Sequence, residues 1–321
     1  MNDSEAIFER YALRLYAWQA HRNPVYRRYL QALGKSELRP QRWTEIPLLP
    51  IRFFKTHQVL SVPSYEAYFV SSGTSNTPHR SRHFIASLAS YHLVARTAYE
   101  RQMGPIDQYY FVGLLPSYLD NSHSSLISMV HHFMRAARQP DFPFLRTDYR
   151  GAELAIRQGR ALGRQVVVFG TPLALLEWIK AGVLDYPDWI IETGGMKGQA
   201  QEWVQEALHT YLRDHFPHTQ VISEYGMTEL LSQSYSTPSD SIRFRPPPWM
   251  RVVAIDPYDP FEVLAPGRRG RLGIIDLANQ HSIAFIATDD LGVVWDDGSF
   301  QLLGRMEQAE VRGCNLLLIE G

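Results

Sequence analysis

The sequence predicts a mixed α/β fold with mainly parallel strands and flanking helices, a class that three observations indicate. Short runs of β-branched and aromatic residues alternate along the chain with longer segments of helical periodicity. Several of these short runs lead into segments that contain Gly, Ser or Thr, and loops at the carboxyl ends of parallel strands are where such sheets bind ligands. The 321 residues are 45% hydrophobic and 20% charged, which is typical of a globular protein with a large core.

The first two thirds of the chain supply the alternating pattern. Ile7, Tyr11, Leu15 and Trp18 recur at helical spacing, so we expect an N-terminal amphipathic helix. The alternating run at 65–70 predicts a strand that leads into a loop rich in Ser, Gly and Thr. The elements expected after this loop are helix 87–101, strand 108–115, helix 124–138, strand 165–169, helix 171–180, strand 189–192, helix 199–215 and strand 219–223.

The pattern changes after Ser236, where short strands replace the alternation. Together they predict a β-rich subdomain, so we divide the chain into an α/β nucleotide- and acyl-binding region at 1–236 and a β-rich subdomain at 237–321. The strands expected in this subdomain are 250–255, 271–276, 284–287, 292–295 and 300–302.

Charge and composition exclude several classes of function. The formal net charge of −1 argues against a generally basic surface that binds nucleic acid. The N-terminus is charged from its start, unlike a secretory signal, and the longest apolar stretch, Val166–Leu176, is too short to span a membrane. The single cysteine, Cys314, cannot form an internal disulfide. These observations predict a cytoplasmic protein with no membrane span.

The first motif with chemical potential is Ser71-Ser72-Gly73-Thr74-Ser75, which follows the strand expected at 65–70. Small residues let the backbone approach a polyanion, and hydroxyl and backbone N–H groups can bind phosphate oxygens. An ordinary polar turn has the same composition, so the motif alone does not decide between the two. The basic side chains that follow could meet negative charge or form a solvated face; they are His79, Arg80, Arg82 and His83.

Two further motifs follow the strands expected at 189–192 and 219–223. Gly194 and Gly195 would let a flat base lie against the backbone, although a turn into a helix is an equally good explanation. In Glu224-Tyr225-Gly226-Met227-Thr228-Glu229, the tyrosine ring could stack on adenine and a carboxylate could hold Mg²⁺ beside phosphates. The alternative for Glu229 is an acidic residue in the first turn of a helix.

The last third carries two more candidates. Asp290, in Thr288-Asp289-Asp290, could accept hydrogen bonds from ribose hydroxyls at a strand end, and the alternative is a hairpin turn. Cys314 could be an acyl acceptor as its thiolate, with Arg312 nearby to lower the thiol pKa. The alternative for Cys314 is a small buried apolar residue.

The order of these motifs is more specific than any one of them. The sequence resembles the adenylate-forming superfamily of acyl-CoA synthetases and luciferases, and within it the LuxE-type acyl-protein synthetase and acyltransferase branch. The resemblance extends from about Trp43 to Leu318. The runs that carry it are Pro50–Lys55, Ser71–Ser75, Glu224–Glu229, Ile275–Asn279 and Arg312–Asn315, of which Tyr-Gly-Met-Thr-Glu at 225–229 is the most specific.

The resemblance implies the N-terminal-domain fold of adenylate-forming enzymes and a role for each matching position. ATP and Mg²⁺ would be required, and the substrate would be a small carboxylic acid, either fatty or aryl. Thr228 would contact phosphate, Glu229 would help to bind Mg²⁺, and Cys314 would accept the acyl group. The nucleotide would be bound by Ser71, Ser72, Gly73, Thr74, Ser75, His79, Gly194, Gly195, Glu224, Tyr225, Gly226, Met227, Asp290 and Arg305.

The sequence departs from the superfamily pattern in three places. Asn76 stands where many members have glycine, and His79 stands where they often have lysine. The mobile C-terminal lid domain of larger members, which supplies a catalytic lysine, is expected to be absent. Lys55 and Lys197 are the candidates to replace that charge.

Several outcomes remain open for the activated acyl group. Transfer to Cys314 and then to a protein or carrier is the leading hypothesis. The alternatives are direct transfer to CoA, an amine or a carrier protein, and a subunit that binds nucleotide or acyl groups without catalysis. The segment 120–125 could line an acyl pocket or simply cap the helix that follows it.

Overall fold

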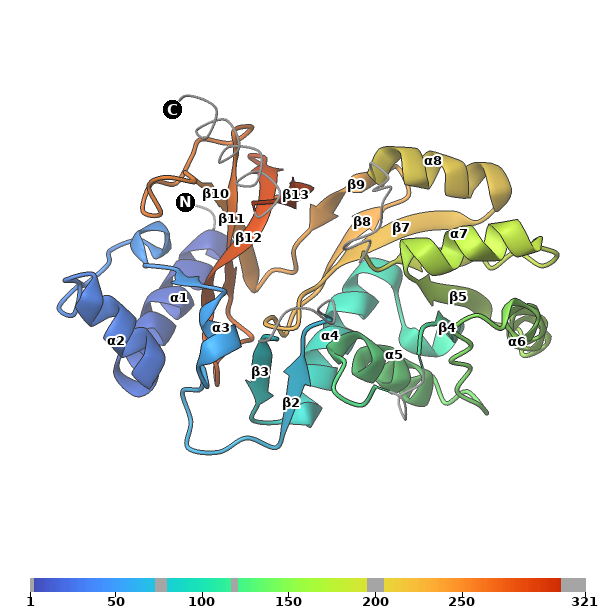
Figure 1. The fold of residues 1–321 in the computed structure, drawn as a ribbon, viewed down its shortest axis with the longest axis horizontal. Helices are drawn as coiled ribbons and strands as arrows, with labels where there is room; N and C mark the ends of the chain where they lie inside the picture. Colours follow the sequence, from blue (N-terminus) through green and yellow to red (C-terminus); the bar gives the residue numbers. More distant parts are fainter. Residues whose placement is uncertain (1–2, 73–79, 117–120, 195–204, 307–321) are drawn as a thin grey trace, which may run out of the picture. The chain divides into compact units, whose positions relative to one another are not determined.

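The computed structural model describes residues 3–72, 80–116, 121–194 and 205–306, which form two compact units with interleaved segments (Figure 1). The first unit contains the described residues of 1–67, 81–86 and 245–321. The second contains those of 68–80 and 87–244. The domain boundary proposed after Ser236 remains a prediction. The compact units do not follow it, because the N-terminal helices pack with the C-terminal strands.

The second unit is built on a sheet whose strand order is β9-β8-β7-β6-β5-β4. Strands β4 to β7 are parallel and β8 is antiparallel to β7, which confirms the predicted mainly parallel α/β arrangement. Its strands are β4 (Tyr109–Leu114), β5 (Gln165–Gly170), β6 (Trp189–Glu192), β7 (Gln220–Tyr225), β8 (Ser234–Thr237) and β9 (Asp240–Arg245). Its helices are α4 (Leu88–Met103), η2 (Ile106–Gln108), α5 (Ser125–Ala136), α6 (Tyr149–Ala161), α7 (Pro172–Ala181) and α8 (Gln205–His215).

Helices cover both faces of this parallel sheet (Figure 1). Alternate side chains of β4 point to opposite faces, so Tyr110 packs with α6, α7 and α8, while Phe111 packs against Phe133 of α5 and Tyr99 of α4. A β-carbon added at Gly159 of α6 would lie 2.8 Å from Tyr110, so this helix can approach the sheet only with glycine here. Burial on both faces explains why these strands are continuous apolar runs in the sequence.

Local capping residues fix where the helices of this unit begin. Ser87, Ser124 and Thr171 each accept a hydrogen bond from a backbone N–H in the first turn of α4, α5 and α7, respectively. Pro172 occupies the first turn of α7, where its missing N–H costs no hydrogen bond. The helices predicted at 87–101, 124–138 and 171–180 are therefore confirmed, each with its expected start.

The first unit contains a four-stranded antiparallel sheet in the order β10-β11-β12-β13, and β1 pairs in parallel with β12. This confirms the predicted β-rich character of the last third of the chain. The strands are β1 (Leu49–Pro50), β3 (Arg82–Ile85), β10 (Met250–Ile255), β11 (Arg269–Asp276), β12 (Phe285–Val294) and β13 (Phe300–Arg305). Strand β2 (Ala67–Val70) has its first residue in this unit and the others in the second. The helices are α1 (Asp3–Arg22), α2 (Pro24–Ala32), η1 (Trp43–Glu45) and α3 (Phe53–Thr56).

The predicted N-terminal helix is confirmed, but its buried face differs from the one that the apolar spacing marks. The helix α1 forms, but Ile7, Tyr11 and Trp18 are 49%, 55% and 37% exposed. The buried face lies one residue further along and ends at Gln19, whose amide donates to the carbonyl of Asn279 at 3.0 Å. A buried polar anchor of this kind cannot be recognised from apolar periodicity.

The prediction of separate strands at 284–287 and 292–295 was also wrong, because both belong to the ten-residue strand β12. The intervening acidic residues remain in the sheet because each is paired across it. Asp289 accepts from Arg271 at 3.0 Å, and Asp290 forms an ion pair with Arg305 at 2.9 Å. The hairpin-turn interpretation of Thr288-Asp289-Asp290 is therefore excluded.

No helix in the described part of the chain has both the length and the apolar character that crossing a membrane requires.

Candidate active site

The carboxyl ends of β6 and β7 lie side by side in the second unit. The strands are parallel, and Glu192 at the end of β6 is paired in register with Ser223 of β7. Gly194 and Tyr225 each lie two residues further along their own chain segment. The sheet therefore brings together two of the segments that the sequence predicts to bind nucleotide, at the edge where such sheets bind ligands.

Buried hydrogen bonds join these two strand ends. Ser223 donates to Glu192 Oε2 at 2.7 Å, and Glu192 Oε1 accepts the backbone N–H of Gly194 at 2.5 Å. Since the single hydroxyl proton of Ser223 goes to Glu192, its oxygen accepts from Gln205 at 2.8 Å and from His209 Nε2 at 2.9 Å. Glu192, Ser223 and His209 are 4%, 1% and 0% exposed, and their hydrogen bonds to one another and to Gly194 N hold the two strand ends together.

Gly194 follows β6 in a backbone conformation that favours glycine. Its φ of +62° lies in the left-handed region, and among the described residues nothing lies within 4 Å of the position that a β-carbon would occupy. Its expected role beside adenine stays a prediction.

Glu224 and Tyr225 end β7 as buried side chains, at 8% and 6% exposure. Burial, and secondly the carboxylate of Glu192, raise the pKa of Glu224 to about 8. The Tyr225 ring lies 5.6 Å from the ring of Phe244, and its hydroxyl donates to the sulfur of Met227 at 3.6 Å. The Tyr225 ring is thus held in a defined orientation within this unit.

The segment after β7 is a turn, closed by a hydrogen bond from Leu230 N to Met227 O at 3.1 Å. No helix begins at Glu229, which excludes the helix-dipole explanation for its charge. Glu229 is 5% exposed, whereas Gly226 is exposed and Thr228 is half-buried. Within the described residues, no group of three His, Cys, Asp or Glu side chains could hold a metal ion. One carboxylate fits Mg²⁺ that is bound mainly by substrate phosphates.

The start of the hydroxyl-rich loop lies beside the segment 121–124 in the same unit. Val70 N donates to His123 O at 2.8 Å, and the His123 ring stacks on Tyr68 at 4.4 Å. Ser124 caps α5, as the alternative for this segment predicted. The capping role does not exclude a ligand role, because the same segment lies next to the strand that leads into Ser71 and Ser72.

The first unit brings together a different pair of predicted residues. Asp290 is paired with Arg305 in the register of β12 and β13, and their side chains form the 2.9 Å ion pair. Asp290 lies inside a strand and is 3% exposed, so the expectation of an acid at a strand end was wrong. Lys55 is half-buried on α3, in a segment where Ile51 N donates to Ala287 O at 2.9 Å.

His83 does not belong to a solvated basic face. It is 1% exposed in the first unit, where its Nε2 lies 3.2 Å from Asn279 Oδ1 and its ring meets the edge of Phe54. Arg80 and Arg82 are exposed. The predicted site residues that lie outside the described part of the chain are Gly73, Thr74, Ser75, His79, Gly195, Lys197 and Cys314.

Sequence reasoning missed Ser223, His209 and Gln205, and it gave Glu192 no role of its own. A signal was available for two of them, because Glu192 and Ser223 are polar residues that end neighbouring parallel strands. His209 and Gln205 gave no signal, since both lie on a helix whose buried face is recognised by Leu208 and Leu212.

A protein-family model matches the C-terminal part of the chain. The model described as "Acyl-protein synthetase, LuxE" matches residues 179–321, which include the paired strand ends and the Asp290–Arg305 pair. Residues 179–321 carry a LuxE-type sequence. The resemblance stated from the motifs is thereby confirmed over this LuxE-type region. No curated protein sequence matches the chain.

Solved structures of adenylate-forming enzymes share the fold. A 2-hydroxyisobutyryl-CoA ligase in complex with its acyl-AMP is 12% identical, with a TM-score of 0.69 over 94% of this chain and 68% of the ligase. ATP-bound MatB from Rhodopseudomonas palustris is 15% identical, with a TM-score of 0.55 over 74% of this chain and 48% of MatB.

The amide bond synthetase McbA from Marinactinospora thermotolerans is 17% identical, with a TM-score of 0.53 over 77% of this chain and 49% of the synthetase. The chain thus spans about two thirds of the ligase and about half of MatB and McbA. At these identities the likeness establishes the fold, and it confirms the α/β class predicted from the sequence.

Proposed function

We propose that this protein activates a carboxylic acid with ATP and Mg²⁺ to form an acyl-adenylate. One observation carries the proposal: the Glu192–Ser223 pairing brings Gly194 and the Tyr225 segment to one edge of a parallel sheet, within a LuxE-type region. The fold shared with a ligase solved together with its acyl-AMP supports the same chemistry.

In the proposed reaction, a carboxylate oxygen of the substrate attacks the α-phosphorus of ATP. A C–O–P bond forms, the bond between the α-phosphorus and its bridging oxygen breaks, and pyrophosphate leaves. Gly194 and Tyr225 would hold adenine, Asp290 and Arg305 the ribose, and Ser71 and Ser72 the phosphates. Thr228 and Glu229 would position phosphate and Mg²⁺. Positioning and charge neutralisation account for the acceleration in such a reaction.

We further propose that the acyl group passes to Cys314 and then to a protein or carrier acceptor. The cysteine thiolate would attack the acyl carbonyl, and AMP would leave. The support is the LuxE-type sequence of residues 179–321, which includes this cysteine. Direct transfer to CoA or an amine is the second candidate, since relatives of the fold are named as a CoA ligase and an amide bond synthetase.

The test is exchange of labelled pyrophosphate into ATP, in the presence of Mg²⁺ and a panel of short, long and aryl carboxylic acids. We expect exchange that depends on the added acid, and its loss in Tyr225→Ala. Tyr258→Ala is the matched control, because Tyr258 is 96% exposed in the first unit. A folded protein that binds ATP without exchange for any acid would instead be a nucleotide-binding subunit.

A further inference from the structure

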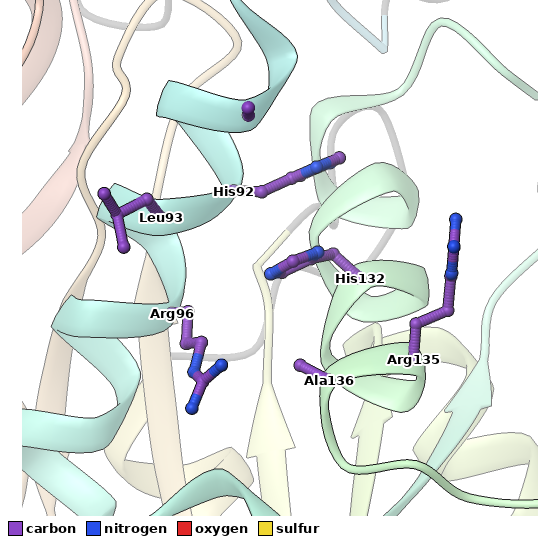
Figure 2. A pocket seen from close by; sticks show the side chains of 7 residues that line it. His92, Leu93, Arg96, His132, Arg135 and Ala136 are labelled. Atoms are coloured by element: carbon purple, nitrogen blue, oxygen red, sulfur yellow. The ribbon is translucent and has the colours of Figure 1, made fainter.

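A concave surface in the second unit lies between α4 and α5, outside the residues assigned to adenylation. Its cavity volume is about 490 Å³, which is within the range of small-molecule sites. Figure 2 shows His92 from α4 and His132 from α5 pointing toward each other in this pocket. The pocket is lined by Ala89, His92, Leu93, Arg96, His132, Arg135 and Ala136.

The two imidazoles are in direct contact. Their rings stack with centroids 4.4 Å apart and planes 5° from parallel, and His92 Nε2 lies 2.9 Å from Ser128 Oγ. Stacked parallel rings do not aim two nitrogen lone pairs at one point, which argues against a shared metal ion. In the described part of the chain, no cluster of three metal-ligating side chains includes them.

The charged groups around the stacked pair are mostly basic. Arg96 projects from α4, and Arg135 and His131 belong to α5. Among the described residues, the Glu100 carboxylate binds Arg96 at 2.9 Å and thereby holds that guanidinium in place. Burial, followed by these neighbouring cations, lowers the pKa of His132, and burial followed by the neighbouring histidines lowers the pKa of His92 to about 4. An anion in the pocket would relieve this repulsion.

We propose that this pocket binds an organic phosphate, with the phosphate against the basic side chains and the remainder against Leu93 and the two alanines. A phosphate monoester carries close to two negative charges near neutral pH and offers three acceptor oxygens, which suits the donors of Arg96, His132 and Arg135 better than one carboxylate does. The pocket exceeds what a bare phosphate ion needs, and Leu93 offers apolar surface at 65% exposure. Bound phosphate favours the protonated imidazoles, so binding strengthens as the pH falls.

The test follows the imidazole NMR signals of His92 and His132 in the full-length protein. They are assigned with His92→Asn and His132→Asn, and the protein is titrated with phenyl phosphate, benzoate and inorganic sulfate. Because the readout is local, binding of phosphate at the adenylation site does not mimic it. We expect saturable shifts with phenyl phosphate at about tenfold higher affinity than with benzoate. Equal or tighter binding of benzoate at these signals would overturn the assignment to phosphate.

Variants and pH complete the test. Arg135→Gln should weaken phenyl phosphate about tenfold, whereas Arg101→Gln, an exposed arginine on α4 outside the lining, should not. If Arg135→Gln does not fold, Arg96→Gln serves in its place. Sulfate keeps its charge throughout, and the pKa of the free His92 is about 4, so the affinity for sulfate should rise several-fold between pH 6.5 and pH 4.5. Unchanged sulfate affinity over this range, or no shift of either histidine with any anion, would overturn the proposal.

Discussion

Ser223 donates a 2.7 Å hydrogen bond to Glu192, and this bond ties together the carboxyl ends of two neighbouring parallel strands. The same carboxylate accepts the backbone N–H of Gly194, so one buried side chain fixes both the residue beside the proposed adenine site and the strand that leads to Tyr225. The arrangement predicts that nucleotide affinity depends on residues that do not touch the nucleotide.

Ser223→Ala tests this dependence. The substitution leaves Glu192 with one donor fewer, so the free energy of unfolding should fall by about 1–3 kcal/mol. The KM for ATP should rise about tenfold while the KM for the acid stays within twofold, as measured by pyrophosphate exchange. Thr219→Val is the matched control: the Thr219 hydroxyl also makes a buried 2.7 Å bond, to Pro187 O, but next to the amino end of β7. An equal rise in the KM for ATP in both variants would show that the loss of stability alone causes the effect.

Glu224 should make the stability of the ligand-free protein depend on pH. Its pKa is about 8 when folded and 4.5 when unfolded, so between these values the folded state holds a proton that the unfolded state has lost. The contribution of this group to stability therefore falls as the pH rises from 4.5 to about 8, by about 1.4 kcal/mol per pH unit.

Glu224→Gln removes that titration. Relative to the wild type, its midpoint of urea unfolding should be similar near pH 5 and higher at pH 8. Measuring both proteins at several pH values checks this outcome. A difference that does not change between pH 5 and pH 8 would show that Glu224 is already ionised in the folded protein.

The Asp290–Arg305 ion pair should matter for nucleotide binding. Asp290→Asn removes the buried charge that holds Arg305, and we expect the dissociation constant for ATP to rise about tenfold by calorimetry. Asp289→Asn is the control, because Asp289 is the adjacent acid on the same strand and pairs with Arg271 instead. If the two variants lose affinity equally, the effect belongs to the strand as a whole.

Cys314→Ser separates adenylation from acyl transfer. Pyrophosphate exchange should stay within twofold of the wild type, because the thiol acts only after the acyl-adenylate has formed. Incubation with labelled acid and ATP should label the wild type in a form that hydroxylamine releases, and should leave the variant unlabelled. Persistent label in the variant would remove Cys314 from the mechanism and favour another acceptor.

The parallel strands were predictable from sequence because strands buried on both faces are continuous apolar runs, as at Val166–Phe169. The capped starts at Ser87, Ser124 and Thr171 were predictable for a different reason, since the cap is a local interaction. The proposed site segments could be recognised because they follow these strands directly.

Long-range pairing limited what the sequence could predict. Strand β12 continues through Asp289 and Asp290 only because Arg271 and Arg305 lie opposite them on neighbouring strands. The buried face of α1 includes Gln19, whose partners lie some 260 residues away. Both are buried polar contacts between distant segments, which leave no periodic trace in the sequence.

Isotope transfer from the acid to AMP tests the central claim most directly. The acid that gives the strongest pyrophosphate exchange is labelled with ¹⁸O in its carboxylate and incubated with the protein, ATP, Mg²⁺ and an acceptor thiol or amine. Attack of the carboxylate on the α-phosphorus predicts that one ¹⁸O atom appears in each AMP, with none in pyrophosphate. Label in inorganic phosphate, or AMP without label, would show that the acyl group is not activated as an adenylate.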